Sequence, residues 1–344
     1  SWLALVMLLN AIALGVITGW GRRFDRLAAG WWWVAFLTLL GPIALGRIDS
    51  ITVPLALVGV SLIATRPRAA AVLLTAAAWV KVWPGALVIA MVVATRQRLR
   101  VLTAAVETSA VVVGFALLFG SGTNVFSFVT QQTGRGLQVE APVSTFWMWQ
   151  AAAQVKGVAV YYDQDILTWQ VRGAGVAAAS ALMTPLLLVM VAGIAILGVR
   201  AVRRGATAAA LLPPLMLAFL VGLIAFQKVG SPQFISWLAV PIVLGLISHR
   251  AGLAAGFRTP ALLVLLLGAL TQLIYPTLYG HLLGLFPPML MVLTVRNLML
   301  FVILGWAIGA IVRSSRWGPD NAAIGATPAA TATANSLGRS EDHA

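Results

Sequence analysis

Long apolar runs, separated by short polar connections, make up almost the whole chain. A run of roughly 17 to 25 apolar residues is long enough to cross the hydrocarbon core of a bilayer as a helix. The runs do not alternate between apolar and polar positions, as the strands of a membrane barrel would. The pattern predicts an all-α polytopic membrane protein with about eleven transmembrane helices, near residues 1–20, 28–45, 50–65, 69–81, 84–95, 101–119, 174–199, 206–226, 233–248, 260–278 and 288–312.

The composition excludes a water-soluble globule. The chain is 60% hydrophobic and only 9% charged, whereas soluble domains are about 25% charged. The net charge of +14 would favour a nucleic-acid partner, but most arginines gather in short clusters between apolar runs, so no nucleic acid is expected. Without cysteine there is no disulfide or thiolate site, and no His or carboxylate spacing predicts a metal. We expect no cofactor.

The arginine clusters predict the orientation of the helices. They occur at every second connection, and the opposite connections carry the remaining cations scattered one or two at a time. The clusters are Arg22/Arg23/Arg26, Arg66/Arg68, Arg96/Arg98/Arg100, Arg200/Arg203/Arg204, Arg250/Arg258 and Arg313/Arg316. Because cytoplasmic loops of membrane proteins are rich in Lys and Arg, this alternation places Ser1 outside and the C-terminus inside. The predicted location is the plasma membrane.

Two long polar stretches interrupt the apolar pattern. Residues 120–173 form an outside loop whose amphipathic, aromatic part "STFWMWQAAAQV" is expected to lie on the membrane surface. Residues 317–344 are small, polar and poor in hydrophobic side chains, which predicts a disordered cytoplasmic tail. The transmembrane core is thus expected to be residues 1–316.

Polar side chains in or near the outer connections gather in six short strings, all predicted to lie at one membrane face. The strings are "GRIDS" (46–50), "WVKVWP" (79–84), "GRGLQVE" (134–140), "QKVGSPQF" (227–234), "YPTLYGH" (275–281) and "TVRN" (294–297). Several cations with few acids suit an anionic headgroup such as a phosphate, since Arg offers paired donors and Lys a point charge. The candidate binding residues are Lys81, Arg135, Gln138, Lys228, Ser231, Gln233, His281 and Arg296.

Simpler interpretations exist for some of these residues. Lys81 and Lys228 are near helix ends, where lysines commonly extend to the interface without a further role. Arg135 and Glu140 are close enough in sequence to form a solvated loop pair. His281 is compatible with an interfacial position that has no function.

Other polar residues call for different interpretations. Arg296 is about two turns into the last predicted helix, where a charge costs about 3 kcal/mol or more unless it is paired or lies in a polar cavity. Glu107 is also inside a helix, and no partner is evident from the sequence, so a structural or neutral role is favoured. "DQD" at 163–165 resembles a metal motif of nucleotide-sugar enzymes, but a surface loop is the better interpretation. The tryptophan run 31–33 predicts an interfacial belt.

Four of the strings give the chain a resemblance to a known family, glycosyltransferase family 87. Its members are GT-C mannosyl- and arabinofuranosyltransferases of actinobacteria that use polyprenyl-phosphate sugars. The family's Gly-polar-x-Asn/Asp turn resembles Gly46–Asp49, and its Lys-x-x-Pro break resembles Lys81–Pro84. Its Arg-Gly-Leu-Gln-x-Glu loop resembles Arg135–Glu140. Its Ser-Pro-Gln-aromatic string before Trp-Leu-x-x-Pro resembles Ser231–Phe234 followed by Trp237–Pro241.

The resemblance covers roughly residues 1–312 and implies a GT-C-like fold. It implies transfer of mannose or arabinofuranose from a polyprenyl-phosphate donor to a glycolipid or glycan acceptor of the cell envelope, at the extracytoplasmic face of the bilayer. Residues 228–233 would then line the pocket for the lipid-phosphate sugar. A carboxylate would deprotonate the acceptor, and cations would stabilise the departing phosphate.

The catalytic base of that family has no counterpart in this sequence. The family's Asp is in the first outside loop, followed by Tyr-Pro-Pro, upstream of the first matching string. Ser1 enters an apolar segment without an initiator Met, so we expect a fragment whose base lies upstream of Ser1. Glu140 and Asp49 are the fallback candidates for the catalytic residue.

Two other classes of function stay open at this stage. A secondary transporter or lipid flippase would also be polytopic, but transporters usually have related halves and ionisable groups near the midplane. This sequence has no visible repeat, and its polar groups gather at one face. A noncatalytic membrane scaffold is the third possibility, and it would tolerate replacement of Lys228 and Arg296 without loss of a glycan product.

Overall fold

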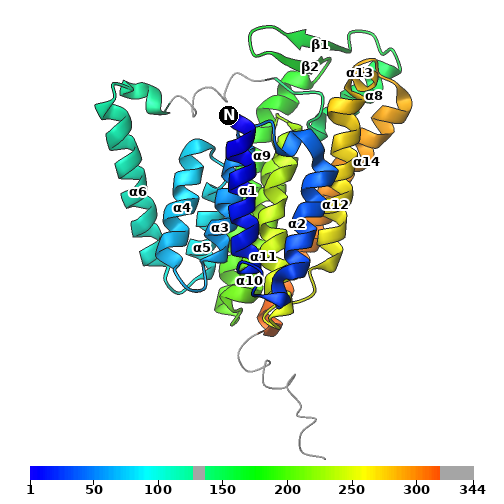
Figure 1. Cartoon of the computed structure of the whole chain (residues 1–344). Helices are drawn as coiled ribbons and strands as arrows, with labels where there is room; N and C mark the ends of the chain where they lie inside the picture. The colour runs from blue at the N-terminus through cyan, green and yellow to red at the C-terminus, as the bar shows by residue number, and fades with distance from the viewer. Residues whose placement is uncertain (127–135, 318–344) are drawn as a thin grey trace, which may run out of the picture.

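The molecule is a bundle of helices topped by a small hairpin (Figure 1). A computed structural model describes residues 1–126 and 136–317. The long elements are α1 (Trp2–Thr18), α2 (Leu27–Leu40), α3 (Asp49–Ser61), α4 (Pro67–Val80), α5 (Gly85–Ala94), α6 (Arg98–Leu118), α9 (Val176–Arg203), α10 (Ala208–Ala225), α11 (Ala239–Arg250), α12 (Arg258–Gln272) and α14 (Pro287–Arg313). The predicted all-α class is confirmed, apart from the two strands.

Within the described residues, seven helical stretches are long and apolar enough to cross a membrane, which is consistent with a polytopic membrane protein. They are Phe24–Ala44, Arg98–Leu118, Val176–Arg203, Ala208–Ala225, Pro232–Arg250, Arg258–Thr277 and Pro287–Arg316. Four shorter apolar helices, α1, α3, α4 and α5, occupy the places of the other predicted segments. The count of eleven crossings stays a prediction, because these four are shorter than 18 residues.

The two ends of the bundle differ in what they carry. The hairpin, α8 (Thr145–Ala152) and α13 (Tyr279–Leu283) lie at one end, together with the start of α1 (Figure 1). The opposite end carries the connections after α1, α3, α5, α9 and α11, and the end of α14 (Figure 1). These are the connections with the arginine clusters, so the clusters share one end of the bundle. Which end faces the cytoplasm stays a prediction from the charge pattern.

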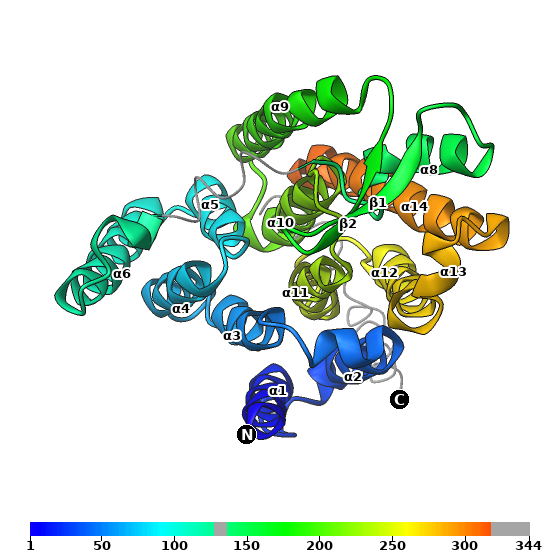
Figure 2. The same cartoon turned by 90° about the horizontal axis from the view of Figure 1, so that it is seen from above.

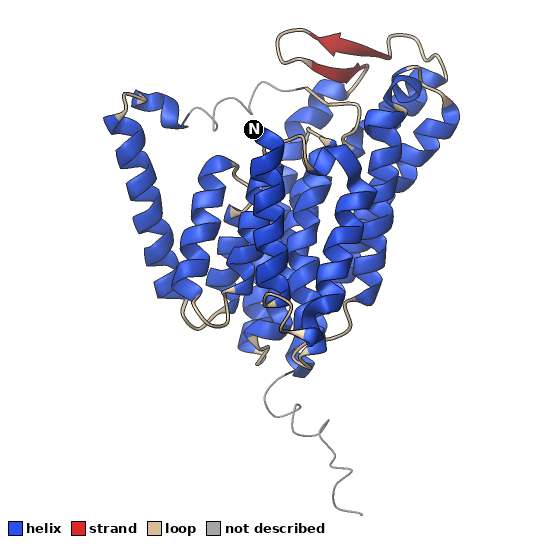
Figure 3. Ribbon diagram, viewed as in Figure 1, coloured by secondary structure: helices blue, strands red, loops and turns tan. Residues whose placement is uncertain are grey.

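The hairpin is the main feature that the sequence pattern did not predict (Figure 3). Strands β1 (Ala159–Asp163) and β2 (Thr168–Arg172) pair antiparallel, with Tyr161 opposite Gln170. Their aromatic and β-branched residues suit a strand, but five-residue runs give little periodic signal. The "DQD" string forms the turn, where Asp163 Oδ1 accepts the amide N–H groups of Asp165 and Ile166. Its interpretation as a surface loop is confirmed.

The centre of the bundle is α10, the most completely buried of the seven spans. It packs against α5, α9, α11 and α14, and Figure 2 shows it enclosed by neighbouring helices. Its sequence is apolar on all sides, as expected of a helix without a solvent or lipid face. By contrast, α6 and α9 lie at the periphery and expose most of their apolar surface.

The tryptophan run at the start of α2 corrects the prediction of an interfacial belt. Only Trp31 is exposed, whereas Trp32 and Trp33 are buried. Trp32 stacks on Phe36 and donates its indole N–H to the carbonyl of Ala261 on α12. Two of the three rings therefore lie in the bundle core: Trp32 through this hydrogen bond and its stacking, and Trp33 through stacking on Phe36.

Candidate functional site

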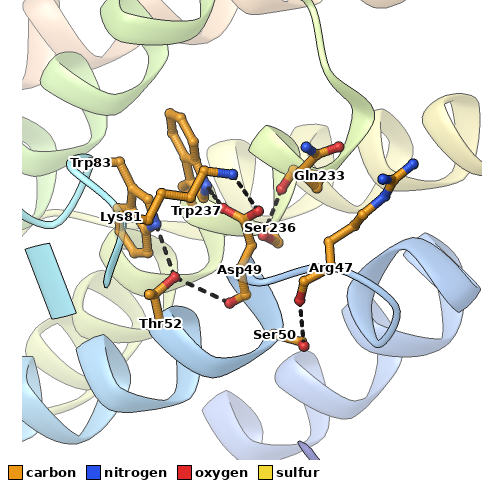
Figure 4. Close-up of polar contacts among 9 residues, drawn as sticks. All are labelled: Arg47, Asp49, Ser50, Thr52, Lys81, Trp83, Gln233, Ser236 and Trp237. Atoms are coloured by element: carbon orange, nitrogen blue, oxygen red, sulfur yellow. Dashed lines mark hydrogen bonds and ion pairs between the residues drawn. The ribbon is translucent and has the colours of Figure 1, made fainter. Parts of the chain in front are cut away.

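An ion pair joins two of the sequence strings at the hairpin end of the bundle. The Lys81 ammonium lies 2.6 Å from Asp49 Oδ2, and the Trp237 indole N–H donates to Asp49 Oδ1 at 2.5 Å (Figure 4). The Asp49 side chain is only 2% exposed and that of Lys81 is 24% exposed. Both oxygens of this buried carboxylate are therefore engaged, by a cation on one side and a donor on the other.

Local sequence explains how the three residues reach one point. Asp49 is the first residue of α3, where a carboxylate is favoured by the partial positive charge of the helix N-terminus. Lys81 is the extended residue that ends α4, and Pro84 directly precedes α5. Trp237 belongs to η5 (Pro232–Leu238), the turn of helix that leads into α11. Because α3 packs against both α4 and η5, the three side chains meet.

Aromatic rings surround this ion pair. The Trp83 ring stacks on the Trp237 ring with a centroid separation of 5.5 Å, and its N–H donates to Thr52. The Phe234 ring lies 4.4 Å from the Trp237 ring. The Lys81 ammonium lies 5.1 Å from the centroid of Phe234, within the range of a cation–π interaction. These rings hold Lys81 in place as well as screening it from solvent.

Lys81 and the rings of Trp83, Phe234 and Trp237 form one wall of a cavity of about 720 Å³. Its other walls come from α5, α9 and α10 and are mainly apolar, with Met183, Leu187 and Phe219 among them. Its polar groups are Lys81, Thr184, Gln227, Lys228, Ser231 and Gln233. Lys81 and Lys228 are the charged residues of the described lining, so the cavity is apolar along its walls and cationic at the η5 end.

A second polar cluster anchors the loop after residue 136. The Tyr279 hydroxyl donates to Glu140 Oε1 at 2.7 Å. Arg296 Nη1 donates to the backbone carbonyl of Glu140 at 3.3 Å and to Asn297 Oδ1 at 2.7 Å. The Asn297 amide in turn donates to Thr145 Oγ1. Arg296 is only 2% exposed, so the charge predicted to lie at depth is hydrogen-bonded within protein.

Burial shifts the titration of two members of this cluster. It raises the pKa of Glu140 above its ordinary value, and the hydrogen bond from Tyr279 opposes that change only in part. Burial raises the pKa of Tyr279 as well, and the adjacent Glu140 carboxylate adds to that increase. A buried carboxyl with a raised pKa is favoured in its protonated form at higher pH than an exposed one.

Backbone contacts connect the two clusters. The amide N–H of Gln138 donates to the carbonyl of Lys228 at 3.0 Å, and Gln138 also pairs with Gln170 of β2. Gly230 packs so closely on the loop that a Cβ there would overlap the backbone of Glu140 and Ala141. The loop thus lies on the segment that carries Lys228, and the Arg296 cluster fixes both.

The structure divides the predicted site residues into groups. At the cavity are Lys81, Lys228, Ser231 and Gln233. In the loop cluster are Gln138, Glu140 and Arg296. His281 is exposed, and its ring faces Phe286. Arg135 lies outside the described residues. Neither fallback catalytic residue, Asp49 or Glu140, lines the cavity.

Some relevant residues carried no sequence signal. Met183 and Thr184 line the cavity from α9, a helix that the sequence marked only as apolar. Glu107, which had no evident partner, pairs with Arg68 at 2.7 Å, because α4 and α6 lie side by side. Across residues 1–126 and 136–317, no group of three or more His, Cys, Asp or Glu side chains is arranged to hold a metal.

Comparisons of the chain with protein-family models, with curated proteins and with solved structures found no match. A functional proposal for this protein therefore depends on the residues and geometry of the cavity. It depends further on the resemblance of the four short strings.

Proposed function

We propose that the chain is an integral membrane glycosyltransferase of the GT-C type. It would transfer mannose or arabinofuranose from a polyprenyl-phosphate donor to a glycolipid or glycan acceptor of the cell envelope. The reaction would take place at the extracytoplasmic face of the plasma membrane, which the charge pattern assigns to the hairpin end. Eleven transmembrane helices, as predicted from the sequence, form part of this proposal.

The observation that carries the proposal is the amphipathic character of the cavity. Its volume of about 720 Å³ is in the range of pockets that enclose small ligands. Apolar walls from α5, α9 and α10 suit an isoprenoid chain, and the positively charged η5 end suits the phosphate that the chain carries. A polyprenyl-phosphate sugar combines these two chemical characters in one molecule.

The arrangement of the resembling strings supports the same proposal. Three of them, at 46–49, 81–84 and 231–241, are far apart in sequence, yet meet around the Asp49 carboxylate beside the cavity. The remaining string contributes Gln138 and Glu140, whose backbone lies against residues 228–230. A shared functional surface explains why these four strings, distant in sequence, lie close together in the fold.

The proposed chemistry is a substitution at the anomeric carbon of the sugar. The bond between that carbon and the phosphate oxygen breaks, a bond to the acceptor oxygen forms, and the acceptor proton passes to a base. The phosphate leaves with the bonding electrons, so cations near it stabilise the transition state. Since neither Asp49 nor Glu140 lines the cavity, the proposal assigns the role of base to neither carboxylate.

The direct test is sugar transfer by the chain in proteoliposomes, with decaprenyl-phosphate mannose and decaprenyl-phosphate arabinofuranose offered in turn. Thr184→Trp would place an indole in the cavity from α9, and we expect it to abolish transfer. Ala192→Trp adds the same ring to a part of α9 that is exposed outside the cavity, and we expect it to be tolerated. Lipid translocation without any glycoside product would instead identify a flippase.

A further inference from the structure

The two lysines of the cavity have different electrostatic surroundings. The Lys81 charge is already balanced by Asp49 at 2.6 Å. If the ammonium left this carboxylate for another anion, a buried negative charge would stay unpaired, which is strongly unfavourable. Its contacts with the rings of Phe234 and Trp237 also oppose such a movement.

Among the described residues, Lys228 lacks such a counter-charge. Within residues 1–126 and 136–317, none of the ion pairs shorter than 4.0 Å includes Lys228, and no acid lines the cavity. Its backbone is nevertheless fixed, because its carbonyl accepts the amide of Gln138 and because Gly230 is wedged against the backbone of Glu140. The structure thus holds the main chain of Lys228 while leaving its ammonium for a ligand, which lowers the entropic cost of binding.

From this contrast we infer that Lys228 is the anion-binding cation of the cavity and that Lys81 is a positioning residue. In this division, the Asp49–Lys81 pair has no net charge and holds Trp237 and Phe234 as the aromatic wall. Among its described lining residues, the cavity then offers one uncompensated positive charge to a phosphate group. The inference rests on the proposed function, since it names the residue that recognises the phosphate of the lipid donor.

The consequence is that the two lysines respond differently to substitution. Removing Lys228 takes away the cation that binds the phosphate, together with the hydrogen bond from its ammonium to a phosphate oxygen. Removing Lys81 together with the charge of Asp49 leaves the net charge of the cavity unchanged. Asn at position 49 retains an oxygen that accepts the indole N–H of Trp237, so the wall keeps its hydrogen bond.

The experiment measures binding of farnesyl phosphate to the full chain in nanodiscs of phosphatidylcholine, with inorganic phosphate as the second probe. We expect Lys228→Gln to raise the Kd for farnesyl phosphate by about 10- to 100-fold and to flatten its salt dependence. Lys228→Arg, which keeps the charge, should bind nearly as the wild type does. The double variant Asp49→Asn/Lys81→Met, which keeps the net charge of the cavity, should lose far less affinity than Lys228→Gln does, and melting curves identify any variant that fails to fold.

Each other outcome has a distinct meaning. Loss of binding in a folded Asp49→Asn/Lys81→Met variant, or unchanged binding in Lys228→Gln, would overturn the division of roles and leave the proposed function intact. A wild type that does not bind farnesyl phosphate would overturn both proposals. Equal, Lys228-dependent binding of inorganic phosphate would support the role of Lys228 but contradict a lipid donor.

Discussion

The guanidinium of Arg296, on α14, donates to the backbone carbonyl of Glu140 and not to its carboxylate. The carboxylate instead accepts the hydroxyl of Tyr279 on α13. Glu140 is therefore held at two separate atoms by two elements that follow it in sequence by more than a hundred residues. This arrangement fixes the main chain of the loop at Glu140. The loop in turn contacts Gly230 and the backbone of Lys228, so the anchoring reaches the segment that lines the cavity.

Replacing Arg296 tests how much this anchoring contributes to stability. Arg296→Met removes the donor to two acceptors, one buried on Asn297 and one part-buried on Glu140, and an unsatisfied buried acceptor costs about 1–3 kcal/mol. We expect a clear decrease of the melting temperature in nanodiscs, followed by circular dichroism. The matched control is Arg203→Met, an exposed arginine in the last turn of α9, which should change stability little. Equal effects of the two variants would show that the Glu140 contact is unimportant.

The raised pKa of Glu140 predicts a dependence of stability on pH. Because burial favours the neutral carboxyl, the folded state binds this proton more tightly than the unfolded chain does. The stabilisation is fully present below the ordinary pKa of 4.5 and is lost as the pH rises through the raised value. Melting temperatures from about pH 4 to about pH 8 should therefore fall less steeply in Glu140→Gln than in the wild type. Parallel curves for the two proteins would contradict this origin.

Gly230 is predicted to be intolerant of a side chain. A Cβ at this position would overlap the carbonyl of Glu140 and the amide nitrogen of Ala141, both of which are backbone atoms. Gly230→Ala should therefore displace the loop, lower the melting temperature and weaken binding of farnesyl phosphate. Gly114→Ala in α6, where the added methyl meets open space, should be neutral or stabilising by up to about 1 kcal/mol. A fully stable Gly230→Ala protein would show that the loop adapts without cost.

The Asp49–Lys81 pair should show strong coupling in a double-mutant cycle. Lys81→Met alone leaves the buried Asp49 carboxylate unpaired, and breaking such a pair typically costs about 3–5 kcal/mol. Adding Asp49→Asn removes the stranded charge, so the double variant should be more stable than Lys81→Met alone. Thermal unfolding of the four proteins measures the coupling. Additive effects of the two substitutions would show that the carboxylate is hydrated and not buried.

Features that depend only on residues close together in the sequence were predicted well. The apolar runs predicted the positions of the long helices, because each segment must itself be apolar and long enough to lie in lipid as a helix. The arginine clusters predicted that the connections carrying them lie at the same end of the bundle, because charge bias is likewise a property of each connection by itself. The short strands of the hairpin were missed, because five residues give too weak a pattern beside long helices.

Partners of polar side chains could not be predicted in the same way. Asp49 and Lys81 were both candidates, yet nothing in the sequence indicated that they neutralise each other. Glu107 had no evident partner until the packing of α4 on α6 brought Arg68 to it. Such contacts depend on how helices are oriented about their axes, which a pattern of apolar and polar positions defines poorly when a helix is apolar on most sides.

The sequence by itself determined that the chain is a helical membrane-type protein, that its arginine clusters share one end, and that its functional candidates gather in short strings. Only the tertiary structure decided which candidates meet. It placed Lys81 beside Asp49, left Lys228 without a counter-charge in the part of the chain that the structure describes, and formed the cavity from apolar residues of α9 and α10 that carry no signal of their own. The physical reason is that hydropathy and charge bias act within a segment, whereas a cavity and an ion pair exist only between packed helices.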